Sequence, residues 1–422
     1  MSVTIPFQDY RWSRMRYQLG GAILLAIALP AAIRYVLLAS QDSSYQLFVT
    51  MASSFVAMVL GVWISRSINT YPGVESTSYV VPAIATSYGI LLLILIAGRF
   101  PYNRAVLFSG WAISTIWFFV IYSSVQRRQT LQIGIVPPCN GNALQEVKGV
   151  NTFFLTDPER PPSVIDAVMA DLRIPLPSEW DAALADYALR GIPVYHLKHL
   201  KESLTGRVEL EHISESNFGS LTPRLSVMVI KRIADFLLAL CVGIFLLPLF
   251  VVIGLAIRST SPGPALFKQK RMGYRGNPFL VYKFRTMTAE LPSVEARTAA
   301  MTQDSDARIT SVGRFLRRTR IDELPQIINI LKGEMSWIGP RPEALVLSTW
   351  YEAEIPFYRY RHIILPGLTG WAQVNQGHVT NVDDVTEKLY YDFYYIKYYS
   401  IWLDLLILMR TFGTVVSGHG AR

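Results

Sequence analysis

The most informative stretch of this chain reads Arg318-Thr-Arg-Ile-Asp-Glu-Leu-Pro-Gln326. Two adjacent carboxylates, Asp322 and Glu323, follow a group of arginines at positions 314, 317, 318 and 320. Pro325 fits the first turn of a helix that begins near Asp322, because the N–H that proline lacks has no helical partner there. A helix N-terminus offers free N–H groups and a positive dipole end, which favour bound phosphate. Acid beside base at a helix start therefore predicts phosphoryl transfer to or from a carboxylate.

Each residue type in this stretch has a chemical reason to be there. Phosphoryl transfer depends on positioning and charge neutralisation. Arginine forks match phosphate oxygens, Mg²⁺ uses one or two carboxylates together with phosphate oxygens, and a carboxylate can itself attack phosphorus. Adjacent helical residues point about 100° apart, so we expect Asp322 and Glu323 to have different roles. The alternative is that Asp322 only caps a helix and the arginines form a solvated face.

The composition is that of a membrane protein with soluble parts. The chain has 422 residues, of which 51% are hydrophobic and 17% charged, and its mean hydropathy is +0.28. This length predicts two or more domains. We attribute the net charge of +9 to binding of anionic headgroups and a phosphorylated substrate. Nucleic-acid motifs are absent from the sequence, so nucleic acid is not an expected partner.

Cysteine and histidine usage excludes two common kinds of site. Cys139 and Cys241 are far apart and lack CxxC spacing, so neither a disulfide framework nor a zinc site is expected. His196 and His199 read as ordinary surface residues. The first apolar stretch is too long for a cleavable signal peptide and no small-residue cleavage site follows it.

Four apolar segments occupy the first third of the chain, and each approaches the ~20 residues that span a bilayer. They are Leu19–Leu38, Leu47–Ile64, Tyr79–Gly98 and Val106–Tyr122. Four such segments in series predict a transmembrane region over residues 1–128. The basic residues at their ends predict that both termini of this region face the cytoplasm; these are Arg11, Arg14, Arg16, Arg66, Arg127 and Arg128. A small transporter is an alternative, but it needs polar groups at mid-membrane, and the segments offer little beyond Arg34.

Residues 129–222 are expected to form a Rossmann-like cytoplasmic domain, because short strands alternate with helical patterns. The predicted strands are Leu131–Pro137, Asn151–Leu155, Ala167–Leu172 and Ile192–Leu197, and the predicted helix is Ser178–Arg190, capped by Ser178. The first strand is followed by Pro-Pro-Cys-Asn-Gly-Asn and lacks the G-x-G-x-x-G fingerprint. We therefore expect a structural or regulatory role rather than dinucleotide binding.

A further apolar stretch begins with Lys231-Arg-Ile-Ala-Asp235 and runs to about Ile257, interrupted by Pro248. An interior proline removes a helical hydrogen bond and bends the helix. A helix over about 229–257 that enters one leaflet, bends at Pro248 and returns would keep both soluble parts in the cytoplasm. A simple fifth span is the alternative.

The C-terminal part, residues 223–422, is predicted to be an α/β-type catalytic domain that contains this helix. Its motifs resemble, in order, those of the bacterial sugar transferase family, the monotopic polyprenyl-phosphate phosphoglycosyl transferases. The motifs are K-R-x-x-D, the proline-broken helix, K-F-R-T-M from Lys283, D-E-L-P-Q, G-P-R-P from Gly339 and P-G-x-T-G-W-A-Q-V-N from Pro366. Several motifs in one order are far more specific than any one of them. The four leading helices and the Rossmann-like unit resemble large members of the family, the undecaprenyl-phosphate glucose and galactose phosphotransferases.

The resemblance implies a reaction and an active site. Members move a sugar-1-phosphate from a UDP-sugar to undecaprenyl phosphate, release UMP, and use Mg²⁺ and a covalent intermediate on the Asp of the Asp-Glu pair. In this sequence the nucleophile would be Asp322, and Glu323 would assist through metal or proton handling. The implied metal ligands are Asp322 and Glu323. The implied phosphate or substrate positions are Arg317, Arg341, Arg285, Lys283 and Asp392, and those of the re-entrant helix are Lys231, Arg232, Asp235 and Pro248.

The resemblance also implies a setting at the bacterial inner membrane, with the catalytic domain on the cytoplasmic face and membrane lipids around it. It implies the first membrane step of exopolysaccharide, capsule or O-antigen synthesis and a homodimer. A non-catalytic scaffold for a polysaccharide assembly complex is the alternative function. The sequence does not identify the sugar.

Overall fold

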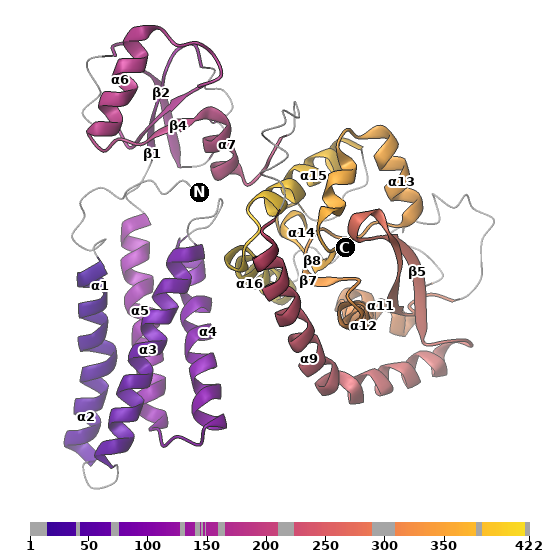
Figure 1. Ribbon diagram of the computed structural model, residues 1–422. Helices are drawn as coiled ribbons and strands as arrows, with labels where there is room; N and C mark the ends of the chain where they lie inside the picture. Colours follow the sequence, from indigo (N-terminus) through magenta and orange to yellow (C-terminus); the bar gives the residue numbers. More distant parts are fainter. Residues whose placement is uncertain are drawn as a thin grey trace. The chain divides into compact units, whose positions relative to one another are not determined.

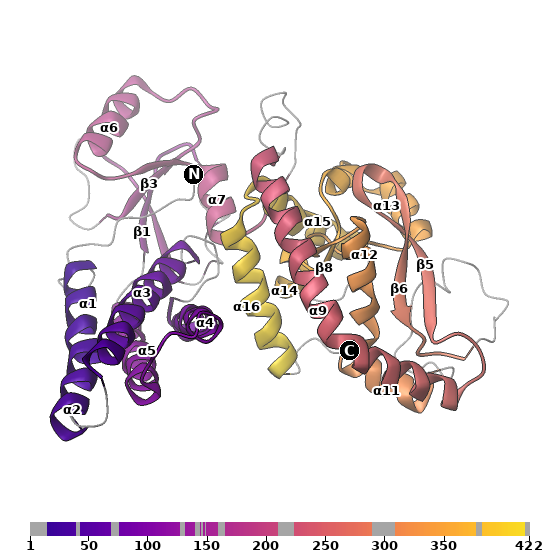
Figure 2. The same ribbon diagram turned by 60° about the horizontal axis from the view of Figure 1, so that its bottom comes forward.

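The computed structural model describes residues 15–38, 43–68, 76–126, 131–139, 144, 147, 149–158, 165–209, 223–288, 309–376 and 382–417. The chain divides into two compact units, Met1–Gly206 and Arg207–Arg422. The first contains the N-terminal apolar helices and a parallel sheet, and the second contains a long bent helix, short strands and the remaining helices (Figures 1 and 2). The acidic pair lies in the second unit. The predicted fold class, apolar helices of a membrane protein combined with α/β parts, is confirmed in these general terms. The predicted domain boundaries stay predictions.

The four N-terminal apolar segments are helical. The first consists of α1 (Met15–Ala22), a π-helical turn η2 (Ile23–Ala28) and α2 (Leu29–Leu38), and the others are α3 (Ser44–Ile68), α4 (Ser76–Ala97) and α5 (Arg104–Gln126). Each is long and apolar enough to cross a membrane. Among the described residues of these helices, the buried polar side chains are uncharged hydroxyls and amides, such as Ser54, Tyr88 and Ser114. The described residues of these helices therefore include no buried charged side chain of the kind that the transporter hypothesis requires. Arg11, Arg14, Arg127 and Arg128 lie outside the described residues.

The predicted Rossmann-like sheet has four parallel strands in the order β2-β1-β3-β4. Its elements are β1 (Leu131–Ile135), β2 (Val150–Phe154), β3 (Ala167–Ala170), β4 (Val194–His196), α6 (Ser178–Leu189) and α7 (Leu197–Thr205). The strands occur where the sequence predicts them. The predicted cap was wrong, because Ser178 is the first helical residue and Pro177 occupies the cap position without a side-chain hydrogen bond. His196 is also not an ordinary surface residue, since its side chain is only 18% exposed and lies against Asp171.

The second unit begins with a long helix, α9 (Leu225–Thr260), followed by an antiparallel hairpin of β5 (Leu266–Met272) and β6 (Pro278–Phe284). The remaining elements are η4 (Tyr274–Gly276), α11 (Ser311–Arg318), η5 (Ile321–Gln326), α12 (Ile327–Lys332), β7 (Ser336–Ile338), α13 (Leu345–Glu354), η6 (Tyr358–Ile363), β8 (Gly367–Thr369), α14 (Trp371–Asn375), α15 (Val382–Lys397) and α16 (Ile401–Ser417). In α15 the aromatic side chains of Tyr391, Phe393, Tyr394 and Tyr395 are buried. These rings pack in the core rather than lining a membrane interface.

Both halves of α9 pack on other elements of the second unit. In the half that precedes Pro248, Ala239 is fully buried against Ile327 and Ile330. Near its end, Ile253 and Ile257 pack against a cluster around Phe284 and Leu316. The two halves run in different directions in both views (Figures 1 and 2), and Pro248 lies inside the helix. The opposite face is apolar and open, with side chains such as Phe245 83% exposed.

Glycines allow two of the quoted motifs to touch. The turn that carries G-P-R-P follows β7, and the P-G-L-T-G segment forms β8, which pairs in parallel with β7. A Cβ on Gly367 would lie 2.0 Å from the Gly339 nitrogen, and a Cβ on Gly370 would lie 2.2 Å from the Gly339 oxygen. No side chain fits at either position, so these glycines bring the backbones together and fix the turn that presents Arg341.

Candidate active site

The acidic pair lies in a 3₁₀ turn rather than in the first turn of an α-helix. Asp322 and Glu323 belong to η5, and α12 begins only at Ile327. Arg320 precedes the turn in the left-handed conformation, with φ 58°, and no side chain caps it. The alternative that Asp322 is only a helix cap is therefore wrong. In a 3₁₀ helix successive side chains point about 120° apart, which separates the two carboxylates.

Glu323 is buried and surrounded by cations. Its Oε1 atom lies 2.6 Å from an Arg341 nitrogen and 3.1 Å from Lys283 Nζ, and Arg320 approaches the same oxygen at 3.8 Å. Burial alone would raise the pKa of Glu323, but the charges of Arg341 and Lys283 outweigh it and hold that pKa well below its usual range. Glu323 is therefore an ionised anchor that fixes two cations.

Asp322 has the opposite environment. Its side chain is half-buried, and within the described part of the chain it forms no ion pair or hydrogen bond. Burial and the neighbouring charge of Glu323 raise its pKa, while Lys283, Arg317 and Arg320 act in the other direction. A carboxylate that lies near several cations but is bonded to none of them is free to react with a phosphorus atom.

Three predicted cations surround this pair from different elements. Lys283 comes from β6, and burial lowers its pKa to about 8 although the charge of Glu323 opposes the change. Arg341 comes from the turn after β7, and the charge of Glu323 raises its pKa. Arg317, at the end of α11, donates to Thr286 Oγ1 at 3.0 Å and also contacts Met287. The K-F-R-T-M motif, D-E-L-P-Q and G-P-R-P therefore meet at one place.

The structure does not bring Arg285 and Asp392 to the acidic pair. The Arg285 guanidinium donates to the Ser261 and Pro262 carbonyls at 2.7 and 2.9 Å, which holds the turn after α9. Asp392 is 2% exposed and forms an ion pair with Arg361 at 2.8 Å. Both side chains are occupied by protein groups, so the geometry favours supporting roles over contact with substrate.

The motif at the start of α9 ties the helix to the rest of the unit. Lys231 Nζ lies 2.7 Å from Asp404 of α16, and Arg232 donates to the Ile330 carbonyl at the end of α12 at 2.8 Å. Asp235 accepts a hydrogen bond of 2.6 Å from Ser336 Oγ. Through Arg232, α9 is connected to the helix that directly follows the acidic pair.

Several residues of the site region were missed by sequence reasoning. Arg361 NH2 donates to the Arg341 carbonyl at 3.0 Å, and Arg271 donates to the Pro342 carbonyl. Lys388 lies 2.6 Å from Glu343, which directly follows Pro342. These partners lie 20 to 71 residues apart in the sequence, and no local pattern signals such pairs.

A bound metal would find one open carboxylate here. No group of three or more His, Cys, Asp or Glu side chains that could hold a metal occurs among the residues that the structure describes. Mg²⁺ does not require such a group, because it binds through one or two carboxylates and substrate phosphates. Asp322 fits that requirement, whereas the Oε1 atom of Glu323 is already shared by two cations.

The comparisons with known proteins agree with the motif order. The family model described as bacterial sugar transferase matches residues 226–418. The UDP-N-acetylgalactosamine-undecaprenyl-phosphate N-acetylgalactosaminephosphotransferase of Aeromonas hydrophila is 41% identical over 375 residues, which cover 88% of this chain and 88% of that protein. The UDP-glucose:undecaprenyl-phosphate glucose-1-phosphate transferase of Caulobacter vibrioides is 40% identical over 205 residues, which cover 48% of this chain and 76% of that protein.

The Aeromonas relative extends the similarity well beyond the catalytic unit, into the region of the N-terminal apolar helices and the parallel sheet. The enzyme hypothesis is thereby confirmed over the scaffold alternative. On this evidence the chain belongs to the bacterial sugar transferase family, and within it to the large polyprenyl-phosphate sugar transferases.

Proposed function

We propose that this enzyme transfers a sugar-1-phosphate from a UDP-sugar to undecaprenyl phosphate and releases UMP, through a covalent phosphosugar on Asp322. The observation that carries the proposal is the contrast within the acidic pair: Glu323 is bound by Lys283 and Arg341, whereas Asp322 is half-buried without a partner in the described structure. The names of the relatives support the two substrates.

In the first step, a carboxylate oxygen of Asp322 attacks the phosphorus atom that carries the sugar. A new oxygen–phosphorus bond forms, and the bond to the bridging oxygen of the diphosphate breaks. The electron pair leaves on that oxygen as part of UMP. Arg341 and Lys283 bond to the neighbouring Glu323 and act electrostatically on Asp322, so their charges would hold the phosphoryl oxygens of the donor before and during transfer.

In the second step, the phosphate oxygen of the polyprenyl phosphate attacks the same phosphorus atom. The bond to Asp322 breaks, its carboxylate is restored, and the sugar is left on a polyprenyl diphosphate. A covalent intermediate allows a soluble donor and a lipid acceptor to use one site in turn. When bound, Mg²⁺ would neutralise diphosphate charge, and Asp322 is the residue best placed to hold it.

We also propose that α9 is re-entrant and that the catalytic unit lies on the cytoplasmic face of the inner membrane. A helix that crossed the bilayer would place its two ends about 30 Å apart on opposite sides. Here Arg232 near one end and Ile257 near the other both contact the same unit, which supports re-entry. In a variant without the native cysteines, new cysteines at Ser226 and Ser259 should both react with an impermeant maleimide in inverted vesicles only. Labelling of one cysteine from each side would establish a span.

The experiment that tests the reaction measures UMP release by purified protein with Mg²⁺, undecaprenyl phosphate and a panel of UDP-sugars. UDP-N-acetylgalactosamine is the first donor to test, because it appears in the name of the Aeromonas relative. Without acceptor, wild-type protein should gain the mass of one sugar phosphate, and Asp322→Asn should gain none. Wild-type UMP release by Asp322→Asn would remove Asp322 from the nucleophile role.

We also propose a place for this reaction in polysaccharide synthesis. The first membrane step of exopolysaccharide, capsule or O-antigen synthesis fits the reaction, because a polyprenyl diphosphate sugar is a substrate for further glycosyl transfer. A homodimer stays a prediction.

A further inference from the structure

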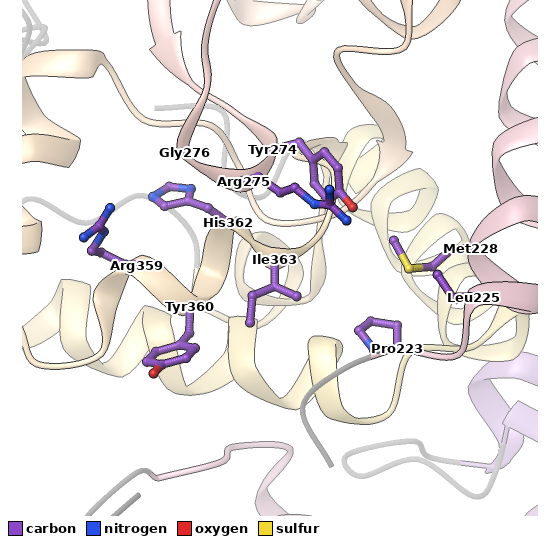
Figure 3. A pocket seen from close by; sticks show the side chains of 10 residues that line it. All are labelled: Pro223, Leu225, Met228, Tyr274, Arg275, Gly276, Arg359, Tyr360, His362 and Ile363. Carbon is purple, nitrogen blue, oxygen red and sulfur yellow. The ribbon is translucent and has the colours of Figure 1, made fainter. Parts of the chain in front are cut away.

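A pocket lies in the catalytic unit beside the N-terminal end of α9. It has a volume of about 380 Å³, within the range of small-molecule sites. Figure 3 shows that its walls come from three segments: the start of α9, the turn of the β5–β6 hairpin, and η6. The lining residues are Pro223, Leu225, Met228, Tyr274, Arg275, Gly276, Arg359, Tyr360, His362 and Ile363.

This pocket is distinct from the acidic pair. Its hairpin wall is the turn at Gly276, and Lys283 lies at the other end of β6. Gly276 and Lys283 are seven residues apart in the sequence, and at ~3.4 Å per extended residue this separates the two by roughly 24 Å. Residues of η6 serve both places. Arg361 donates to the Arg341 carbonyl in the turn beside the acidic pair, whereas its neighbours Tyr360 and His362 line the pocket.

The charge of the pocket comes from two exposed guanidiniums. Arg275 stacks over the Tyr274 ring at 5.0 Å and, in the described structure, has no carboxylate within 4 Å. Arg359 is 81% exposed and lies 3.7 Å from Glu352. His362 adds no charge, because burial and Arg361 lower its pKa to about 3. The pocket therefore presents positive charge to an incoming anion.

The backbone at Arg275 supports a functional reason for this side chain. Its φ is 55°, in the left-handed region, with Gly273 and Gly276 close by in the same turn. A non-glycine residue in this region is uncommon and strained. The chain nevertheless places a long cation here, at the rim of the pocket.

The other lining groups select for an apolar tail. Leu225 and Met228 of α9 lie on one side of the pocket and Arg359 on the other, with Ile363 between them in the view of Figure 3. From Leu225, exposed apolar side chains continue along α9, including Val229, Ile230 and Ile233. The pocket thus joins a cationic end to an apolar surface that leads into the membrane helix.

We propose that this pocket binds the head of a phosphate-bearing lipid, with Arg275 and Arg359 on the phosphate and the lipid chain along Leu225 and Met228. The lipid is either an anionic phospholipid of the surrounding bilayer or a polyprenyl phosphate bound away from the acidic pair. The site lies outside the catalytic groups and does not depend on the proposed reaction.

The test compares lipid retention by the full-length protein and two variants. Native mass spectrometry in detergent would titrate phosphatidylglycerol, undecaprenyl phosphate and, as a zwitterionic reference, phosphatidylcholine. The pocket variant is Arg275→Gln with Arg359→Gln. The control variant, Lys268→Gln with Lys270→Gln, removes the same charge from exposed positions of the same hairpin.

Wild-type protein should bind one of the two anionic lipids over phosphatidylcholine, and the preferred lipid names the source. Undecaprenyl phosphate is counted as the second equivalent bound, because the first would occupy the proposed acceptor site at the acidic pair. Two arginines at ~1 kcal/mol each predict that the pocket variant binds it roughly 30-fold more weakly, with the control unchanged. Undiminished binding by the pocket variant would overturn the proposal. So would an equal loss in both variants, because lipid binding would then follow net charge alone.

Discussion

The two units each contain a carboxylate beside arginine, buried at Asp171 in the first and half-buried at Asp322 in the second. The two carboxylates differ in which of their oxygens are left to bind another molecule. In the sheet of the first unit, Asp171 follows β3 next to the point where the strand order reverses, the usual place for a ligand in such folds. Arg173 holds both of its oxygens at 3.0 and 3.1 Å, and His196 adds a contact of 3.3 Å. The hydrogen bond from Arg173 lowers the pKa of Asp171, whereas the pKa of Asp322 is raised.

The comparison teaches that charge and fold position do not identify the reactive group. Asp171 has the more suggestive place in its fold, but its bonding capacity is used within the protein. Asp322 lies in a short 3₁₀ turn among cations that bond to Glu323, and its own oxygens are left for another molecule. An available carboxylate next to fixed cations is what phosphoryl transfer requires.

The largest expected effect comes from neutralising each carboxylate in turn. Asp322→Asn should lower UMP release by about 10⁴-fold or more, the scale of removing a nucleophile, with an unchanged or higher melting temperature because no bond is lost. Asp171→Asn should lower stability by about 1.5–3 kcal/mol, since hydrogen bonds to a charged group are lost, with normal turnover. Thermal melts and initial rates for both variants check this. If Asp322→Asn instead lost stability and Asp171→Asn lost UMP release, the contrast between the two carboxylates would be wrong.

The next effect separates Glu323 from its neighbour. Glu323→Gln leaves Lys283 and Arg341 buried without their counter-charge, which should cost about 3–5 kcal/mol, or roughly 6–20 °C in melting temperature. Because the folded pKa of Glu323 is depressed, its contribution is complete above the unfolded pKa of about 4.3 and is lost as pH falls through the lower folded value. The difference in stability between wild type and variant should therefore be full at pH 7 and shrink in strong acid. Equal melts at pH 7 would contradict the ion-pair network.

Sequence patterns predicted the elements and the centre of the site better than its supporting groups. Apolar runs marked the helices, and β-type runs marked four strands, because both signals are local. Asp322, Glu323, Arg341 and Lys283 were found from motif order. Arg361 and Arg271 were missed because a buried cation that bonds to a distant carbonyl leaves no periodic trace. Arg285 was assigned to phosphate by its motif, whereas the fold turns its guanidinium towards Ser261 and Pro262.

A smaller effect concerns the fall of kcat/KM at alkaline pH. With a pKa of about 8, Lys283 loses its proton as pH rises through 8 and then no longer bonds to Glu323 as a cation. We expect kcat/KM to fall above pH 8 in wild type, since this ratio reports groups of the free enzyme. In Lys283→Arg the guanidinium stays charged, so this fall should move up by about one pH unit or more. Lys332→Arg, at an exposed lysine that bonds to Tyr282, is the matched control. If kcat/KM of Lys283→Arg falls at the same pH as in wild type, a group other than Lys283 causes the alkaline loss of activity.

The smallest effect tests whether the turn at Arg341 needs its support. Arg361 is 3% exposed and reaches the Arg341 carbonyl, Tyr358 and Asp392 with one guanidinium. Lysine retains the charge but not the fork, so Arg361→Lys should shift Arg341 slightly rather than remove it.

Because Arg341 is proposed to hold the donor phosphate before and during transfer, its displacement weakens ground state and transition state alike. We expect the KM for the UDP-sugar to rise about tenfold with kcat within about threefold, the pattern of lost uniform binding. Arg190→Lys, at an exposed arginine at the end of α6 in the first unit, should leave both constants unchanged. If Arg361→Lys lowers the melting temperature but leaves KM unchanged, Arg361 stabilises the fold without positioning Arg341. The contrast between Asp322 and Asp171 would then depend only on Glu323 and the cations that contact it directly.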